Sequence, residues 1–266
     1  MRYVIERQYT NQVINVPVMT MSPERIVVKV RHPRKPYTYY FDTAPLINGK
    51  DMFVIKIPKM PESVVLEIYN ERNGSTDFDN TFRIGKITVG PIRLSFAINH
   101  IMDENVARFA RFSDWFAENA GVLSAQNSIY ASNDGRFRID FKDVIRDEKG
   151  NPLRTPARVN GVTRVIEISK KHYMRYTVPG RKALNWHEFS HVWKNKNPAD
   201  EIEADKNAIM IYLGTGNPTI EAYNVFLKVY RNSPSNLNRQ RYDELNKFIR
   251  NFNKIMAKQI SQQKAA

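Results

Sequence analysis

Hydrophobic and polar residues alternate along several short runs in the first hundred residues. The apolar members of these runs are Ile26, Val28 and Val30; Phe53, Ile55 and Ile57; Val64, Leu66 and Ile68; and Ile92, Leu94, Phe96 and Ile98. This period of two, interrupted by Pro, Gly and Asn, is typical of strands with one buried face. We therefore expect an antiparallel β-sandwich over residues 1–98, with a bulge at Gly85, where the alternation slips. No cluster of catalytic side chains occurs here, which favours a docking or scaffold module.

The pattern changes near residue 100. Asp103 can cap a helix that runs to about Ala120. Its apolar stripe at helical spacing comprises Val106, Phe109, Ala110, Ser113 and Phe116. Alternation then returns at residues 137–141 and again at 164–169, which predicts two further strands.

From Pro179 onward the chain reads as helical. The breaks are rich in Asn, Gly, Ser and Pro, and they separate helices expected at about 180–195, 199–213, 218–231 and 237–258. The sequence thus predicts an α+β protein. We expect a β-rich domain at 1–98, a second domain with a helical C-terminal half at 99–260, and a frayed tail at 261–266.

The segment most informative about chemistry is a His-Glu-x-x-His motif in the first of these helices. His187 and His191 are four residues apart, so one helix face presents both imidazoles to the same ion. Glu188 lies beside them. A divalent metal held by two neutral imidazoles needs a third protein ligand and an open position for water.

The next helix supplies acidic side chains for that purpose. Glu201 and Asp205 lie one turn apart, and the small Ala204 between them allows a close approach of the two helices. If the helices pack antiparallel, Glu201 completes the site. Asp205 can then accept the free ring N–H of a ligand histidine, which fixes its tautomer.

These residues resemble the zinc metallopeptidases called gluzincins, in particular the thermolysin-like and CAAX-prenyl-protease-like branches. The match covers only about residues 185–208. The resemblance implies a zincin-like fold for the second domain and one Zn²⁺ per chain, bound by His187, His191 and Glu201. It also implies that Glu188 is the general base and that Asp205 orients a ligand. The strand at 164–169 matches the position of the edge strand that lines the substrate cleft in such folds.

One departure from the family concerns spacing. Nine residues, Val192 to Asp200, separate the second histidine from Glu201, which is short for gluzincins. The first helix must therefore end soon after Trp193 and turn sharply. Asp200 and Glu203 are the alternative third ligands. The glycine and third histidine of the metzincin motif are missing, which excludes that family.

The alternative without a metal site is that the acidic residues at 200–205 form a solvated first turn, which the helix dipole favours. Stabilisation of the oxyanion in peptide hydrolysis would need one more donor. Four residues are candidates for this role, although each is more typical of packing or surface positions: His172, Tyr173, Tyr176 and Tyr212.

The amino-acid composition limits the kinds of partner and the cellular location that we expect for the protein. The chain lacks cysteine, which excludes disulfides, thiolate metal sites and cysteine nucleophiles. It carries 41 Lys or Arg against 27 Asp or Glu, a net charge of +14 that favours anionic partners. No apolar signal core or membrane-spanning run occurs, so we expect a cytoplasmic protein or a virion component that is not classically secreted.

Three basic segments have alternative interpretations. Residues 228–266 hold nine Lys or Arg and two acids, and an apolar stripe from Leu245 to Met256 runs through them. We interpret it as a helix packed on its own domain rather than as a nucleic-acid, membrane or partner site. The basic and aromatic run at 31–41 reads as a loop and strand rather than a single-strand binding site. The basic residues at 170–182 either attract acidic substrates to the cleft rim or are merely solvated.

The leading prediction is a zinc-dependent metallopeptidase that acts on a protein or peptide substrate, with Glu188 activating a metal-bound water. The rival is a structural or assembly protein, for example in a bacteriophage neck or tail ring, that keeps a zincin fold. In that case the N-terminal domain would hold homo-oligomer or virion partners. Nucleic acid is a third, less favoured partner, which steep salt dependence of binding would reveal.

Overall fold

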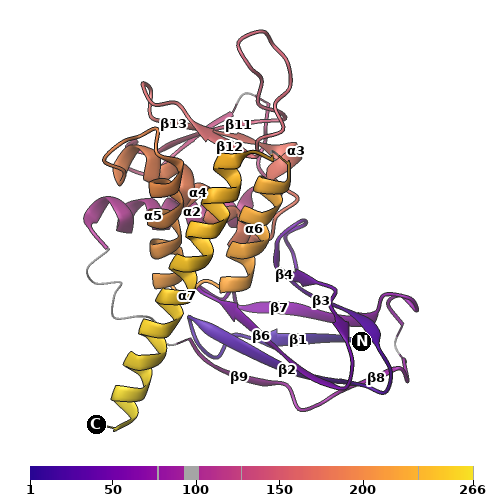
Figure 1. Ribbon diagram of the computed structural model, residues 1–266. Helices are drawn as coiled ribbons and strands as arrows, with labels where there is room; N and C mark the ends of the chain where they lie inside the picture. The colour runs from indigo at the N-terminus through magenta and orange to yellow at the C-terminus, as the bar shows by residue number, and fades with distance from the viewer. Residues whose placement is uncertain (77, 93–101, 127, 233, 266) are drawn as a thin grey trace. The chain divides into compact units, whose positions relative to one another are not determined.

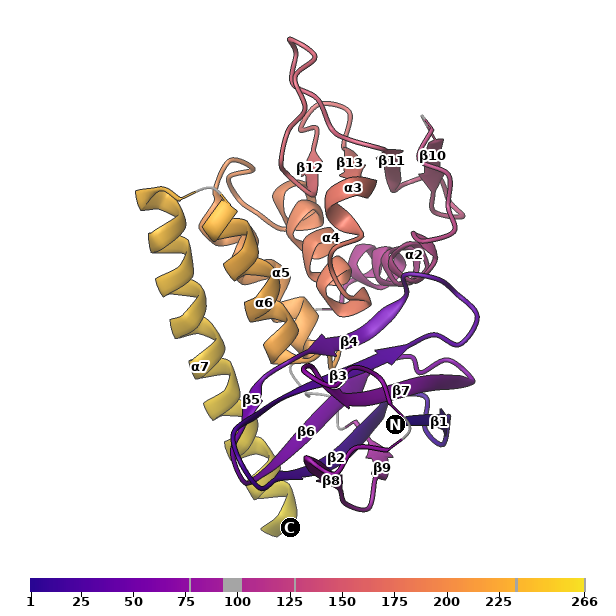
Figure 2. The same cartoon turned by 90° about the vertical axis from the view of Figure 1, so that its right-hand side faces the viewer.

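The chain folds into two compact units, as a computed structural model shows (Figure 1). Residues 1–76, 78–92, 102–126, 128–232 and 234–265 are described, without the side chains of 231, 232 and 256–265. The first unit comprises residues 1–94 with the short segments 177–179 and 216–218, and the second comprises the rest. Figures 1 and 2 show that strands build the first unit, whereas most of the helices belong to the second.

The N-terminal unit consists of two antiparallel sheets. One has the order β1-β7-β3-β4 with β5 also paired to β3, and the other has the order β6-β2-β8 with β9 also paired to β2. The strands are β1 (Arg2–Glu6), β2 (Gln12–Thr20), β3 (Glu24–Arg31), β4 (Tyr39–Thr43), β5 (Leu46–Ile47), β6 (Lys50–Ile57), β7 (Ser63–Asn70), β8 (Phe82–Ile84) and β9 (Thr88–Pro91). The predicted antiparallel sheet architecture of this region is confirmed.

The alternation in sequence corresponds to an alternation in burial. Along β2, Ile14, Val16 and Val18 are buried, while the residues between them are partly exposed. The ring of Phe41 in the first sheet meets the ring of Phe53 in the second edge to face, at a centroid distance of 6.3 Å. The inner faces therefore share one core. The basic and aromatic run at 31–41 thus ends in strand β4, with Phe41 buried in this core, which agrees with the interpretation as a loop and strand.

Gly85 lies where the two short strands β8 and β9 meet. Residues 85–87 lie opposite only two residues of β2, Val16 and Pro17, so one extra residue is accommodated. The N–H of Gly85 donates to the carbonyl of Pro17 at 2.9 Å. A Cβ at position 85 would lie 3.1 Å from the Cβ of Pro17, which explains the glycine. This extra residue is the irregularity that the slipped alternation predicts.

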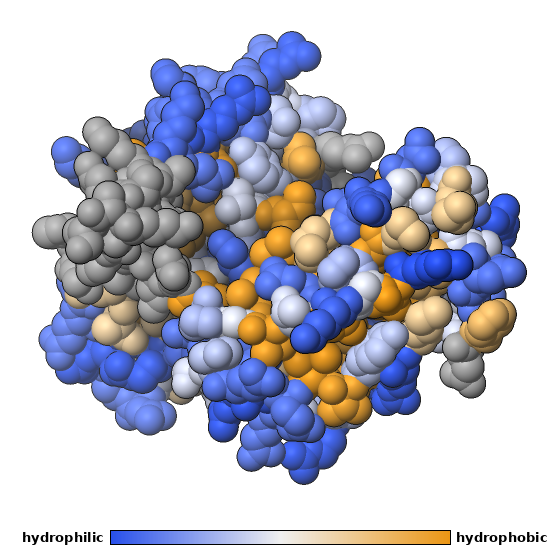
Figure 3. Space-filling model, turned by 90° about the horizontal axis from the view of Figure 1, so that it is seen from below, coloured by the Kyte–Doolittle hydropathy of each residue, from blue (hydrophilic) through white to orange (hydrophobic). Residues whose placement is uncertain are grey.

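The outer face of the β6-β2-β8 sheet carries exposed apolar side chains. Met52 and Val54 are about half exposed, at 49% each, and they lie opposite Pro17 and Asn15 of β2. Figure 3, which views the molecule from below, shows apolar side chains in orange surrounded by hydrophilic ones in blue. The interpretation of this unit as a docking module stays a prediction.

The second unit begins with a helix and a four-stranded mixed sheet. The elements are α2 (Glu104–Asn119), β10 (Ser128–Ala131), β11 (Arg138–Lys142), β12 (Ala157–Val159) and β13 (Val165–Ser169). The sheet order is β10-β11-β13-β12, in which only β11 and β13 run parallel. The predicted strand at 164–169 is therefore not the edge strand expected from the sequence: it lies inside the sheet as β13, and β12 forms the edge.

The helical part of the second unit follows. It consists of α3 (Lys170–Tyr173), α4 (Val178–Trp193), α5 (Glu201–Gly214), α6 (Thr219–Asn232) and α7 (Asn236–Ala265). On α7, Leu245 and Ile249 are buried, and Phe248 and Phe252 pack against the same core. The apolar stripe is therefore covered by its own unit as far as Phe252, as expected. Ile255 is exposed, and the side chain of Met256 lies outside the described residues.

Aromatic rings from α2, from α4 and from Phe137, the residue before β11, meet in the core of the second unit. Phe109 stacks on Phe189 with centroids 4.5 Å apart, and it contacts Phe137 and Trp186 edge to face. Because these rings come from two helices and from the residue that leads into β11, they fix the motif helix α4 against α2 and the start of that strand.

Asp103 caps α2 as the sequence predicts. Its carboxylate accepts the N–H of Val106 at 2.8 Å and contacts the ammonium group of Lys194 at 2.6 Å. Burial acts to raise the pKa of Asp103, but these two donors outweigh it and hold the pKa below its usual 3.8. Its stabilisation is thus fully present above pH ~4 and is lost as the pH falls through the lower folded-state pKa.

We expect Asp103→Ala to lower the free energy of unfolding at neutral pH by about 1 kcal/mol, the usual value of a helix cap. Urea unfolding at pH 7 and at pH 2.5 or below measures this difference, which should shrink in acid. An equal loss at both pH values would contradict the proposed role of the carboxylate.

The predicted strand at 92–98 lies outside the described residues except for Ile92, whose N–H donates to the carbonyl of Asn11. Among the helices that the structure describes, none combines the length and apolar character needed to cross a bilayer.

Candidate metal centre

The motif helix α4 presents both of its histidines to a single point. Because His187 and His191 are one turn apart, their rings lie side by side, and their Nε2 atoms are 3.1 Å from each other. The other face of this helix carries Phe189, which is fully buried among the aromatic rings. The core packing of α4 therefore determines the direction of the two imidazoles.

Glu201, the first residue of α5, reaches the same point. Its Oε2 lies 3.3 Å from Nε2 of His187, and its Oε1 lies 3.8 Å from Nε2 of His191. The three residues form a group that could hold a metal ion. A zinc ion bonded at 2.0–2.2 Å in tetrahedral geometry separates its ligand atoms by roughly 3.3 Å. The observed separations fit that value.

The short connection between the helices makes this reach feasible. Helix α4 ends at Trp193, and the N–H of Asn195 closes its last turn on the carbonyl of Ser190 at 2.8 Å. The side chain of Asn195 then donates to the carbonyl of Asp200 at 2.8 Å, immediately before α5. The nine-residue spacing thus forms the sharp turn that the sequence requires, and Glu201 lies within reach.

Both histidines are oriented by groups behind them. Nδ1 of His191 donates to the carbonyl of Pro198 at 2.7 Å, and Nδ1 of His187 lies 2.9 Å from Oδ1 of Asp205. An N–H on each Nδ1 leaves a lone pair on each Nε2. Two lone pairs and a carboxylate oxygen therefore converge, and a cation at this point would satisfy all three.

Asp205 is the centre of a buried polar network. It is 1% exposed, and its Oδ2 accepts the hydroxyl of Tyr230 at 2.9 Å and Nε of Arg241 at 2.7 Å. Arg241 also donates from Nη2 to Oδ1 of Asp205 at 3.0 Å, and its Nη1 lies 3.0 Å from Oε2 of Glu201. Arg241 thus connects the carboxylate behind the histidine to the third candidate ligand.

The charges of the site sum to a value that a divalent cation balances. Glu188, Glu201 and Asp205 supply three negative charges, and Arg241 supplies one positive charge. With neutral imidazoles the net charge is −2. Uncompensated charge is costly in a buried site, which favours uptake of a cation such as a divalent metal.

The pKa values of His187 and Glu188 reflect the excess of negative charge in the site. Burial lowers the pKa of His187, but the Asp205 and Glu201 carboxylates outweigh this and raise it to about 10. Burial, together with the nearby Glu201, raises the pKa of Glu188 to about 7. The carboxylates that favour a proton on His187 equally favour a metal cation, which competes with that proton.

Glu188 lies between the histidines and the edge of the sheet. It is buried, and it accepts a hydrogen bond from the backbone N–H of Val159 in β12. A cavity of about 540 Å³ runs along β12 and reaches Glu188 and the three candidate ligands. Its remaining lining includes the apolar residues Leu184, Phe226 and Val229, together with the polar Asn238 and Arg241.

The structure separates the alternative residues from the site. Asp200 caps α5 by accepting the N–H of Glu203, and the carboxylate of Glu203 accepts the N–H of Lys196 at 3.0 Å. Both carboxylates thus accept backbone N–H groups at the start of α5 or in the connection before it. Among the four oxyanion candidates, His172, Tyr173, Tyr176 and Tyr212, none lines the cavity.

Sequence reasoning missed Arg241 and Tyr230, which lie 36 and 25 residues from Asp205. A signal for Arg241 was present, because Arg241, Leu245 and Ile249 are spaced four residues apart. The arginine therefore continues the apolar stripe of α7 by one turn onto the buried face. A charged residue in such a position implies a buried partner. The carbonyl of Pro198 has no comparable signal.

Comparison of the chain with protein-family models, with curated proteins and with solved structures found no match. The geometry of the site is therefore the basis on which its function is inferred.

Proposed function

We propose that the chain is a zinc-dependent metallopeptidase of the gluzincin type. The observation that carries the proposal is the convergence of Nε2 of His187, Nε2 of His191 and a Glu201 oxygen at ligand separations, with the Glu188 carboxylate beside them. Two imidazoles and one carboxylate match the donor set of catalytic zinc sites that keep one position open. The resemblance of the motif pair to gluzincins agrees with this set.

The chain's own residues have distinct roles in the proposed reaction. His187, His191 and Glu201 would hold the zinc ion, which supplies a water of lowered pKa and polarises the scissile carbonyl. Glu188 would accept a proton from the attacking water and would deliver it to the leaving amine. Asp205 and the Pro198 carbonyl hold the two imidazoles in the ligating tautomer.

The cavity supports a peptide as the substrate. β12 is the edge strand of its sheet, and the N–H of Val159 brings this edge next to Glu188. An extended peptide can add to such an edge through main-chain hydrogen bonds. Its scissile bond would then lie beside the base and the metal, while an apolar side chain enters the wall at Phe226 and Val229.

Metal analysis combined with an activity assay tests the proposal. We expect about one zinc per chain and cleavage of an unstructured protein, which a chelator abolishes and added zinc restores. His191→Ala should lose both zinc and cleavage, whereas His32→Ala in the N-terminal unit should keep both. Absence of zinc from the wild-type protein, or zinc binding with no cleavage, would contradict the proposal.

A further inference from the structure

A group of basic side chains lies next to the segment at Thr155 and Pro156 that lines the cavity. Arg154 is exposed and immediately precedes Thr155 and Pro156, which line the cavity before β12. On and just after α3, Lys171 and Arg175 are also exposed, and His172 lies between them. We call these four residues, Arg154, Lys171, His172 and Arg175, the basic cluster.

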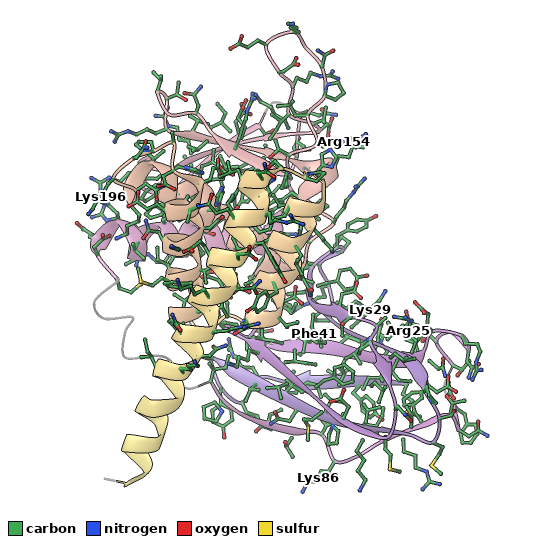
Figure 4. The ribbon with its side chains drawn as sticks, in the orientation of Figure 1. Arg25, Lys29, Phe41, Lys86, Arg154 and Lys196 are labelled. Atoms are coloured by element: carbon green, nitrogen blue, oxygen red, sulfur yellow. The ribbon has the colours of Figure 1, made fainter. Side chains whose placement is uncertain are left out.

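Hydrogen bonds hold the two segments of the basic cluster together. The N–H of Ser169, next to α3, donates to the carbonyl of Pro156 at 2.9 Å. The His172 ring is hydrogen-bonded to the backbone of Leu153. Figure 4, in the orientation of Figure 1, shows Arg154 beside α3. The backbone of the cluster is thus held next to Thr155 and Pro156, the residues that line the cavity before β12.

The electrostatics of the cluster are unbalanced. Burial lowers the pKa of His172, and the charges of Arg175, Lys171 and Arg154 lower it further. Within the described part of the chain, no acidic side chain forms an ion pair with Arg154, Lys171 or Arg175. Residues 142–175 hold nine Lys or Arg against four Asp or Glu, the exposed Asp143 among them. An anionic ligand would relieve this repulsion.

The surroundings of Lys196, another basic residue of the second unit, differ from those of the basic cluster. In Figure 4, Lys196 lies far from Arg154, in the connection between α4 and α5. There the acids Asp200 and Glu203 accompany Lys196, and Glu203 accepts its backbone N–H. Lys196 therefore has acidic neighbours in its own connection, in contrast to Arg154, Lys171 and Arg175.

We propose that the basic cluster selects substrates that carry acidic residues on the C-terminal side of the cleaved bond, an inference that rests on the proposed peptidase function. Antiparallel addition to β12 is the more stable pairing, and it directs the C-terminal part of the peptide from Val159 toward Arg154. These residues are five apart, or roughly 17 Å along an extended strand. The acidic side chains should therefore lie about three to five residues beyond the bond.

Peptide binding to a zinc-loaded Glu188→Gln variant tests this selection without relying on turnover. The preferred cleavage site in an unstructured protein, mapped with the wild type, defines three labelled peptides. They carry Glu after the bond, Glu before the bond, or Gln at both places. At low salt, fluorescence anisotropy should show about tenfold tighter binding of the first peptide than of the other two.

A matched pair of variants separates the cluster from overall charge. In the Glu188→Gln background, R154Q/K171Q/R175Q should abolish the preference, while K50Q/R83Q/K86Q, with the same change in net charge in the N-terminal unit, should retain it. Zinc content should be equal in all proteins. Equal binding of the three peptides, or equal loss in both triple variants, overturns the inference while leaving the proposed function intact. Failure of the wild type to cleave would instead refute the function.

Discussion

Glu188→Gln is expected to keep the zinc and to lose the hydrolysis. The amide has nearly the shape of the carboxylate but cannot accept the proton of the metal-bound water, so kcat should fall by about 10²- to 10⁴-fold. Zinc affinity should be nearly unchanged, because Glu188 is not among the three ligand residues. Zinc analysis and the rate of cleavage of a labelled peptide measure the two quantities.

The control for this variant is Glu203→Gln. Glu203 lies on α5 close to the site, yet its carboxylate serves the backbone at Lys196. The Glu203→Gln variant should therefore keep the wild-type kcat. Full activity of Glu188→Gln would remove the base from the proposed mechanism. A metal-bound protein inactive in both wild-type and variant forms would favour the rival interpretation of a structural or assembly protein.

Asp205→Asn should affect both zinc binding and folding. The substitution removes the charge that balances Arg241 in a buried network, and breaking such a pair costs about 3–5 kcal/mol. It also removes the carboxylate behind His187, and loss of such a partner lowers metal affinity by about 10- to 100-fold. Urea unfolding of the metal-free protein and a competitive zinc titration report the two effects separately.

Glu244→Gln provides the comparison for Asp205→Asn. Glu244 is a surface acid that contacts Lys206 at 2.7 Å, and a pair of this kind contributes about 1 kcal/mol or less. Wild-type stability of Asp205→Asn would show that the buried network does not hold the helices together. Unchanged zinc affinity would show that His187 does not depend on Asp205 for its orientation.

The sequence was sufficient for those features of the site that follow from helix periodicity. The spacing of His187 and His191, and that of Glu201 and Asp205, each determines a shared face of one helix. The same applies to the cap at Asp103 and to the alternating strands of the N-terminal unit. In each case the relevant contact lies within one element or between neighbouring positions.

Features that depend on distant contacts could not be derived in this way. β12 has only three residues, too few to show an alternation, so the longer and more apolar β13 was mistaken for the edge. The apolar stripe of α7 places Arg241 on the buried face, but no local pattern specifies that this face packs on α5 and brings Arg241 to Asp205. The carbonyl of Pro198 contributes through its backbone, which the residue type does not reveal.

The place of Arg241 in the chain has a consequence for biosynthesis. The histidines and both carboxylates that contact Arg241 or the candidate metal position all precede it by at least 36 residues. While the segment containing Arg241 is still inside the ribosome, the emerged chain already carries the ligand set but not the guanidinium that organises two of its acids. Full preorganisation of the centre therefore has to wait until α7 has emerged and docked, which would delay the proposed activity in the nascent polypeptide.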